Sequence, residues 1–171
     1  RPHLLQTCRR PHRVSSEMTM AHTDIMSRYA DAFAALTPET MDDLIATLSP
    51  QVRFKDPFNE VVGHDAFRAI FTHMFETCEA PRFHITDIAR SNPKEGPRAY
   101  LRWRMSGRIR GWPHTSLDLE GMSEIHIGDD GPVTAHIDHW DSASQLLVRL
   151  PLIGLLLRPA LRLFRVRTGG R

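Results

Sequence analysis

The sequence lacks the features that define several protein classes. It has only two cysteines, Cys8 and Cys78, which form neither a disulfide framework nor a zinc-ligand spacing. It has no uncharged apolar run of about eighteen residues, so no membrane-spanning helix is expected. A glycine-rich phosphate loop, a nucleophile elbow and a zinc signature are also missing. What remains, with 41% hydrophobic and 25% charged residues, is the composition of one ordinary globular domain.

The formal net charge of +2 conceals two basic ends and an acidic middle. Residues 1–16 carry four arginines and no acid, and residues 142–171 carry six arginines and no acid. Residues 17–141 hold ten arginines, two lysines and all twenty acids, which gives this block a charge of −8. An acidic body repels phosphate, so no nucleic-acid partner is expected.

The two ends of the chain are expected to lie outside the domain, which would span residues 21–142. Residues 1–20 contain no apolar signal region and are interpreted as a disordered or spurious extension of a cytoplasmic protein. Residues 143–171 are rich in leucine and arginine and predict an amphipathic C-terminal helix, broken into short pieces by Pro151 and Pro159. This helix could pack over the domain or against a second subunit, or make weak contact with an anionic membrane surface.

Periodicity predicts helices first and strands later. Ile25, Tyr29 and Phe33 recur at helical spacing, and Thr37-Pro38-Glu39 begins a second helix that Ser49-Pro50 ends. A third helix is expected between Gly63 and Cys78. Alternating residues predict five strands, at 52–55 and around 83–85, 99–105, 117–127 and 133–141. The order predicts an α+β fold: a cone-shaped, curved antiparallel sheet packed on three N-terminal helices, with a hollow suited to an apolar molecule.

Three features could carry chemistry. Asp56 closes a strand before a proline and could be a general base in an apolar hollow or a residue that stabilises a turn. Tyr29 lies on the apolar stripe of the first helix, where a buried phenol needs a hydrogen-bond partner. The segment from His136 to Asp141 contains two histidines, but His136 and His139 point to opposite faces of a strand. No metal and no cofactor are therefore expected, and Asp138 shares a face with His136 and Trp140.

Two motifs stand out: Val52-Arg53-Phe54-Lys55-Asp56-Pro57 after the second helix, and Gly131-Pro132-Val133 leading to Asp138-His139-Trp140-Asp141. Together with the order of elements, they resemble the nuclear transport factor 2-like superfamily, in particular its SnoaL-like small proteins, over residues 22–150. The resemblance implies a cystatin-like curved sheet and a small-molecule cavity.

Two enzyme branches of this superfamily each match in part. In ketosteroid isomerases an aspartate base, a tyrosine and a protonated aspartate act together. Asp56 and Tyr29 match the first two, and Ser123 stands where the third would be. In limonene epoxide hydrolase, Asp138 matches a catalytic carboxylate, but the Arg-x-Asp pair of an earlier strand is replaced by Arg102-Trp103-Arg104.

The resemblance therefore implies an isomerase or lyase that removes a proton alpha to a carbonyl of an apolar substrate. Asp56, Tyr29 and Asp138 are the candidate catalytic residues. The candidate substrate-binding residues are Trp103, Ser123, His136, Trp140, Phe58 and Phe71. The alternatives are a non-catalytic binding module for a hydrophobic ligand and a scaffold that dimerises through the open face of its sheet. A homodimer is expected in either case.

Overall fold

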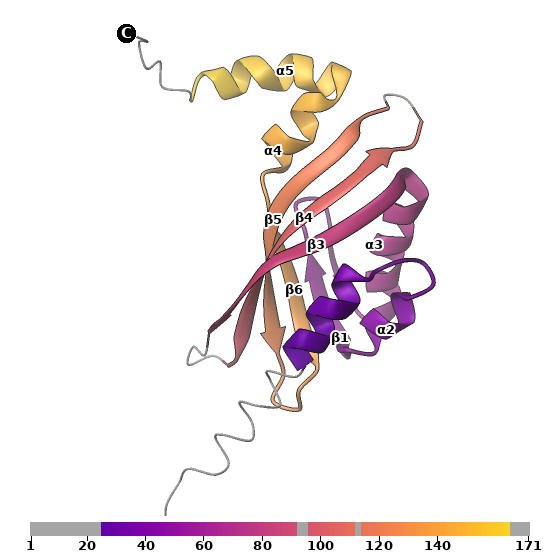
Figure 1. Cartoon of the computed structure of the whole chain (residues 1–171). Helices are drawn as coiled ribbons and strands as arrows, with labels where there is room; N and C mark the ends of the chain where they lie inside the picture. The colour runs from indigo at the N-terminus through magenta and orange to yellow at the C-terminus, as the bar shows by residue number, and fades with distance from the viewer. Residues whose placement is uncertain (1–24, 92–95, 112–113, 165–171) are drawn as a thin grey trace, which may run out of the picture.

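The computed structural model describes residues 25–91, 96–111 and 114–164 of the chain (Figure 1). The extension predicted at residues 1–20 and the last part of the predicted C-terminal segment, residues 165–171, lie outside the described residues. Residues 25–34 are helical. The further helices are α2 (Met41–Ile45), α3 (His64–Thr77), α4 (Ser142–Gln145), the 3-10 turn η1 (Leu147–Arg149) and α5 (Pro151–Arg162). The strands are β1 (Leu48–Lys55), β2 (Glu60–Val62), β3 (Cys78–Ser91), β4 (Arg98–Ile109), β5 (Ser116–Ile127) and β6 (Val133–His139).

The strands form one six-stranded sheet in the order β2-β1-β6-β5-β4-β3, which confirms the predicted α+β class. Neighbouring strands run antiparallel except for β1 and β6, which pair in parallel. The expectation of a purely antiparallel sheet is wrong at this pair. The chain passes through α3 and three long strands before β6 returns beside β1, and such a return can run in either direction. The short edge strand β2 was not predicted from the sequence.

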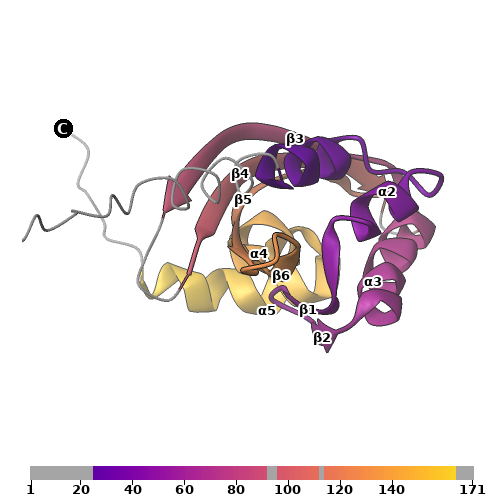
Figure 2. The ribbon, with the colours of Figure 1, turned by 90° about the horizontal axis from the view of Figure 1, so that it is seen from below.

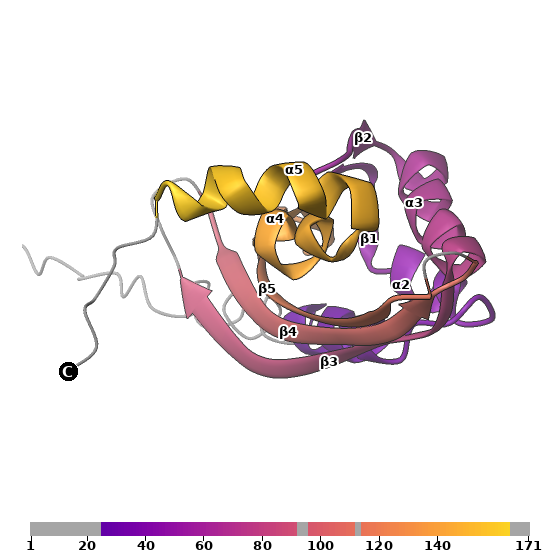
Figure 3. The ribbon, with the colours of Figure 1, turned by 90° about the horizontal axis from the view of Figure 1, so that it is seen from above.

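The long strands curve around the helices (Figures 2 and 3). The register between β3 and β4 shifts twice, between Glu79 and Arg82 and between Ile85 and Asp87. Ala80, inside the first irregularity, has a left-handed backbone with φ of 46°. Irregularities of this kind bend a strand and increase its twist. They let β3 and β4 arch over the first helix and α3 instead of lying flat.

The second helix is shorter than predicted. Four apolar residues fit one helical stripe before Ser49-Pro50, namely Met41, Leu44, Ile45 and Leu48. However, α2 ends at Ile45, and Leu48 already belongs to β1. The hydroxyl of Thr47 donates to the carbonyl oxygen of Leu44 at 2.6 Å, which caps the end of the helix. Leu48 is buried through its pairing with Val133 on β6. Helical spacing over four apolar residues could not distinguish these two ways of burying Leu48.

Aromatic side chains fill the core between the helices and the sheet. Phe33 of the first helix packs edge-on against Phe71 of α3, with ring centroids 5.7 Å apart. Phe54 of β1 packs in the same way on Phe67 and Phe71. Such tilted pairs are favoured over stacked ones. A second apolar cluster, around Trp103 on β4, lies nearer to α4 and surrounds the cavity described below.

The C-terminal helices differ from their prediction in two respects. β6 ends at His139 and not at Asp141, because Asp141 instead caps α4 by accepting a hydrogen bond from the amide of Ser144 at 2.9 Å. Pro159 lies inside α5 and does not end it. The carbonyl of Leu155, which loses its amide partner, belongs to an exposed residue and can bind water. No described helix is long and apolar enough to cross a membrane.

Candidate functional site

A cavity of about 350 Å³ opens between the C-terminal half of α3 and the concave face of the sheet. Its wall is mainly apolar and aromatic. Asp56, Asn59, His73, Thr77 and Asp138 are among the polar residues that line it. The apolar and aromatic lining residues include Phe54, Phe58, Phe71, Phe83, Trp103, Met105, Leu117, Leu119, Trp140 and Leu146. An apolar hollow with a few polar groups is the usual form of a small-molecule site.

A chain of hydrogen bonds leads from this cavity into the core. Trp103 donates from Nε1 to the hydroxyl of Ser123 at 2.9 Å, and Ser123 donates to Oδ1 of Asp138 at 2.5 Å. His136 Nε2 lies 2.8 Å from the same oxygen, and His136 Nδ1 bonds to the hydroxyl of Tyr29. Strand register explains the grouping, because Ser123 on β5 directly faces Asp138 on β6. His136 and Asp138 are two residues apart and so share a face of β6.

The direction of each bond follows from the chemistry of the groups. An ionised Asp138 can only accept, so Ser123 donates its hydroxyl proton and His136 donates from Nε2. A neutral histidine protonated at Nε2 has an acceptor at Nδ1, which receives the proton of Tyr29. Burial, and then the negative charge of Asp138, raise the pKa of Tyr29 well above its ordinary value of 10, so this phenol keeps its proton. The arrangement fixes one tautomer of His136 and one orientation of the carboxylate.

The members of this chain differ in their access to the cavity. Asp138 and Trp103 line it, whereas Tyr29, Ser123 and His136 do not. Tyr29, Ser123 and His136 are completely buried. Both contacts to the carboxylate use Oδ1, and no hydrogen bond to Oδ2 is made within the described parts of the chain. Asp138 is therefore the ionisable member of the chain that a bound molecule can contact directly, beside the indole of Trp103.

Asp56 lies at the cavity wall, but its carboxylate stabilises the turn that follows β1. Its Oδ1 accepts hydrogen bonds from the amides of Phe58 and Asn59 at 2.7 and 2.6 Å. The side-chain amide of Asn59 lies 3.1 Å from both carboxylate oxygens. Aspartates commonly stabilise turns in this way. Within the described ranges, no hydrogen bond links Asp56 to Tyr29, so the structure does not join these two candidates.

The aromatic candidates lie around the cavity. Phe58 and Trp140 form an edge-on pair at its wall, with ring centroids 5.9 Å apart. Phe71 lines the cavity from α3 and also belongs to the core. Trp103 lies against Gly121, where a Cβ atom would come within 2.6 Å of the indole ring. The missing side chain of Gly121 leaves room for the indole of Trp103 to lie over β5, where it bonds to Ser123.

One side of the cavity was missed by the sequence analysis. Ile70, His73, Met74 and Thr77 line it from α3. Their spacing of three and four residues marks one helix face, of which only Phe71 was predicted to contact a ligand. Cys78 also lines the cavity, and burial raises the pKa of its thiol above the usual value. The polar residues His73 and Thr77 interrupt an otherwise apolar helix face, and this pattern could have indicated that the face lines a cavity.

The fold and the cavity define the class of protein: a curved sheet over helices of the nuclear transport factor 2-like type. The SnoaL-like domain matches residues 27–136, and the chain belongs to this family. No curated protein matches the chain.

Solved structures show the same fold. A putative polyketide cyclase from Silicibacter sp. TM1040 is 25% identical, with a TM-score of 0.57, covering 73% of this chain and 92% of the other. A second putative polyketide cyclase, from Xanthomonas campestris pv. campestris, is 19% identical, with a TM-score of 0.59 and coverage of 74% and 95%. A hypothetical protein with a ketosteroid isomerase-like fold from Catenulispora acidiphila DSM 44928, solved in complex with trimethylamine, is 15% identical, with a TM-score of 0.61 and coverage of 75% and 94%.

Proposed function

We propose that the protein binds a small apolar molecule in the cavity and that Asp138 exchanges a proton with it. One observation carries the proposal: Asp138 lines the cavity while Ser123 and His136 hold only its Oδ1. The two donors fix the carboxylate, and Oδ2 has no partner among the described residues. A positioned carboxylate in an apolar surrounding is a suitable general base or acid.

The simplest reaction is proton removal alpha to a carbonyl group. Oδ2 of Asp138 takes the proton, and the electron pair of the broken C–H bond moves into an enolate. Return of the proton to another carbon isomerises the substrate. Attack of the enolate carbon on a second carbonyl instead closes a ring and forms an alkoxide, to which the proton held by Asp138 is returned. Two of the similar structures are described as putative polyketide cyclases, and ring closure by an enolate is one reaction that such a base promotes.

Tyr29 and His136 act in this scheme as positioning residues. Tyr29 supplies the proton that His136 Nδ1 accepts, which leaves Nε2–H directed at Asp138. The geometry favours Asp138 over Asp56 as the base, because the carboxylate of Asp56 is engaged by the amides of its own turn. It also favours a positioning role for Tyr29 over direct contact with an enolate oxygen, since Tyr29 does not line the cavity.

The test is deuterium exchange at the α carbon of apolar cyclic ketones, including a 3-ketosteroid, followed by NMR in heavy water. Asp138→Asn keeps the shape of the side chain but removes the base, and it should lower the exchange rate by about a hundredfold or more. Asp56→Asn is the matched control, because it lines the same cavity and its amide oxygen can still serve the turn. Loss of exchange in Asp56→Asn with full exchange in Asp138→Asn would contradict the assignment.

A second candidate function is binding without chemistry. The largely apolar wall favours it, as does the absence of any buried polar side-chain atom without a hydrogen-bond partner among the described residues. Native mass spectrometry of freshly purified protein separates the two functions. A co-purified apolar ligand that is recovered unchanged, together with no ketone exchange by the wild-type protein, supports binding alone.

A further inference from the structure

The helix α5 is fastened to the domain along one narrow face. Gly154 is its buried residue, and a Cβ atom there would lie 2.2 Å from the carbonyl oxygen of Val148 in η1. Arg158 donates to the same oxygen at 3.1 Å. Leu157 and Leu161, which follow Gly154 at helical spacing, are half-buried. These contacts hold α5 in place while using only a minority of its apolar side chains.

The remaining apolar side chains of α5 are open to solvent. Leu152, Leu155 and Leu156 are 76%, 71% and 77% exposed, and Ile153 is 45% exposed. Leu163 and Phe164 extend this surface beyond the end of the helix. The spacing of these residues places them on one broad side, opposite Gly154. Isolated exposed apolar residues are ordinary, but a contiguous group of this kind marks an interaction surface.

The charge of this part of the chain selects among possible partners. Arg158 and Arg162, one turn apart, form the cationic edge of α5. The sequence after Asp141 carries six arginines and no acid, whereas residues 17–141 carry a charge of −8. Pairing of α5 with α5 of a second copy would cover the leucines but would offer the arginines no negative charge, because residues 142–171 contain no acid. An anionic lipid surface offers both hydrocarbon for the leucines and negative charge for the arginines.

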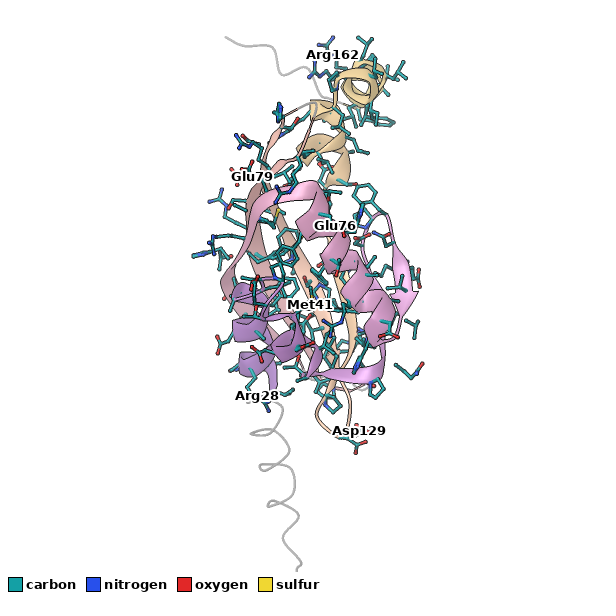
Figure 4. The ribbon with its side chains drawn as sticks, turned by 90° about the vertical axis from the view of Figure 1, so that its right-hand side faces the viewer. Arg28, Met41, Glu76, Glu79, Asp129 and Arg162 are labelled. Carbon is teal, nitrogen blue, oxygen red and sulfur yellow. The ribbon has the colours of Figure 1, made fainter. Side chains whose placement is uncertain are left out.

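The position of α5 suits contact with a flat surface. Figure 3 shows α5 lying across the end of the domain, and Figure 4 shows its Arg162 far from Asp129 at the opposite end. Its twelve residues correspond to about 18 Å, which is shorter than a bilayer core of about 30 Å. The helix can therefore lie in the interface but cannot span it.

From these observations we propose that α5 docks the domain on an anionic membrane surface, with its leucines in the acyl boundary and its arginines at the headgroups. Docking does not require the chemistry proposed for Asp138. It does place the cavity close to lipid, because Leu146, which precedes η1, lines the cavity.

The experiment is flotation of the full chain with vesicles, either of phosphatidylcholine alone or with about one third phosphatidylserine. The wild-type protein should float with the anionic vesicles, and added salt should weaken binding. The triple variant Leu152→Gln/Leu155→Gln/Leu156→Gln should weaken binding by at least about tenfold. This is a lower limit, because full burial of even one large apolar side chain contributes about that much. Arg162→Gln should weaken it by about fivefold.

Matched controls use exposed residues of the domain body. Val62→Gln/Met122→Gln removes two exposed apolar side chains that belong to β2 and β5, and Arg104→Gln removes an exposed arginine of β4. Both should bind as the wild type does. Circular dichroism melts of all variants confirm folding, and Arg162→Gln, a single surface change, provides the test if the triple variant unfolds. The proposal is overturned if the wild-type protein does not float with anionic vesicles, or if the control variants lose as much binding as the α5 variants. It is also overturned if the α5 substitutions abolish self-association and leave vesicle binding unchanged.

Discussion

Replacement of Tyr29 by phenylalanine removes one buried hydroxyl and leaves the aromatic ring in the core. His136 Nδ1 then loses its only described hydrogen-bond partner in a completely buried position. Leaving a buried acceptor unpaired costs about 1–3 kcal/mol, so urea unfolding at neutral pH should show a loss of this size. The matched variant Tyr100→Phe removes the other tyrosine hydroxyl of the chain, from the sheet surface, and should cost less.

The same substitution makes a prediction about alkaline pH. Burial first, and then the charge of Asp138, raise the pKa of Tyr29 in the folded protein. Above about pH 10 the unfolded chain therefore loses a proton that the folded chain keeps, and stability falls by about 1.4 kcal/mol for each pH unit. Tyr29→Phe lacks this contribution. The stability difference between wild type and Tyr29→Phe should shrink as pH rises above that point.

Tyrosinate absorbance provides an independent measurement. The sequence has two tyrosines, so in the Tyr100→Phe protein the absorbance reports on Tyr29 alone. It should appear together with the loss of the circular dichroism signal. Tyrosinate formation near pH 10 in a protein that is still folded would refute the buried hydrogen-bond chain, and so would a stability difference that stays constant with pH.

Two further substitutions test the supports of the site. Gly121→Ala places a Cβ atom within 2.6 Å of the Trp103 ring and 2.8 Å of Trp140 Cβ, so it should cost about 1–3 kcal/mol in urea unfolding and shift the tryptophan fluorescence. Asp141→Ala removes the cap of α4 and should cost about 1 kcal/mol at neutral pH. Hydrogen bonds from the side chain and then the amide of Ser144 lower the pKa of Asp141, so its contribution is present at neutral pH and disappears as pH falls through that lowered pKa. A variant equally destabilised at acid and neutral pH would contradict this account.

Local periodicity was enough to predict most of the fold. The stripe at Ile25, Tyr29 and Phe33 and the long alternating runs report directly on which side of an element is buried. Local periodicity could not predict features that depend on the pairing of strands distant in the sequence. The parallel register between Leu48 and Val133 and the two irregularities in β3 are properties of neighbouring strands, which a single segment does not encode.

The same distinction applies to the candidate site. Alternation along β6 placed His136 and Asp138 on one face, and the resemblance singled out Tyr29, Asp56 and Ser123 as separate candidates. The sequence could not show that Tyr29 bonds to His136, because 107 positions separate them and the contact depends on how the first helix crosses the sheet. Nor could it show that the carboxylate of Asp56 is engaged by its own turn, since the residue type suits both roles.

The parallel pairing of β1 with β6 also bears on the order in which the chain can fold during synthesis. β1 leaves the ribosome early, yet its inner edge is completed only by β6, near the end of the domain. Until then β1 has only the three-residue β2 beside it, and its other edge can pair with a foreign strand. Contacts this distant in sequence also slow folding. A nascent chain that stalls before Val133 would therefore expose a strand edge that can pair with another chain. A chaperone would be most useful at this stage.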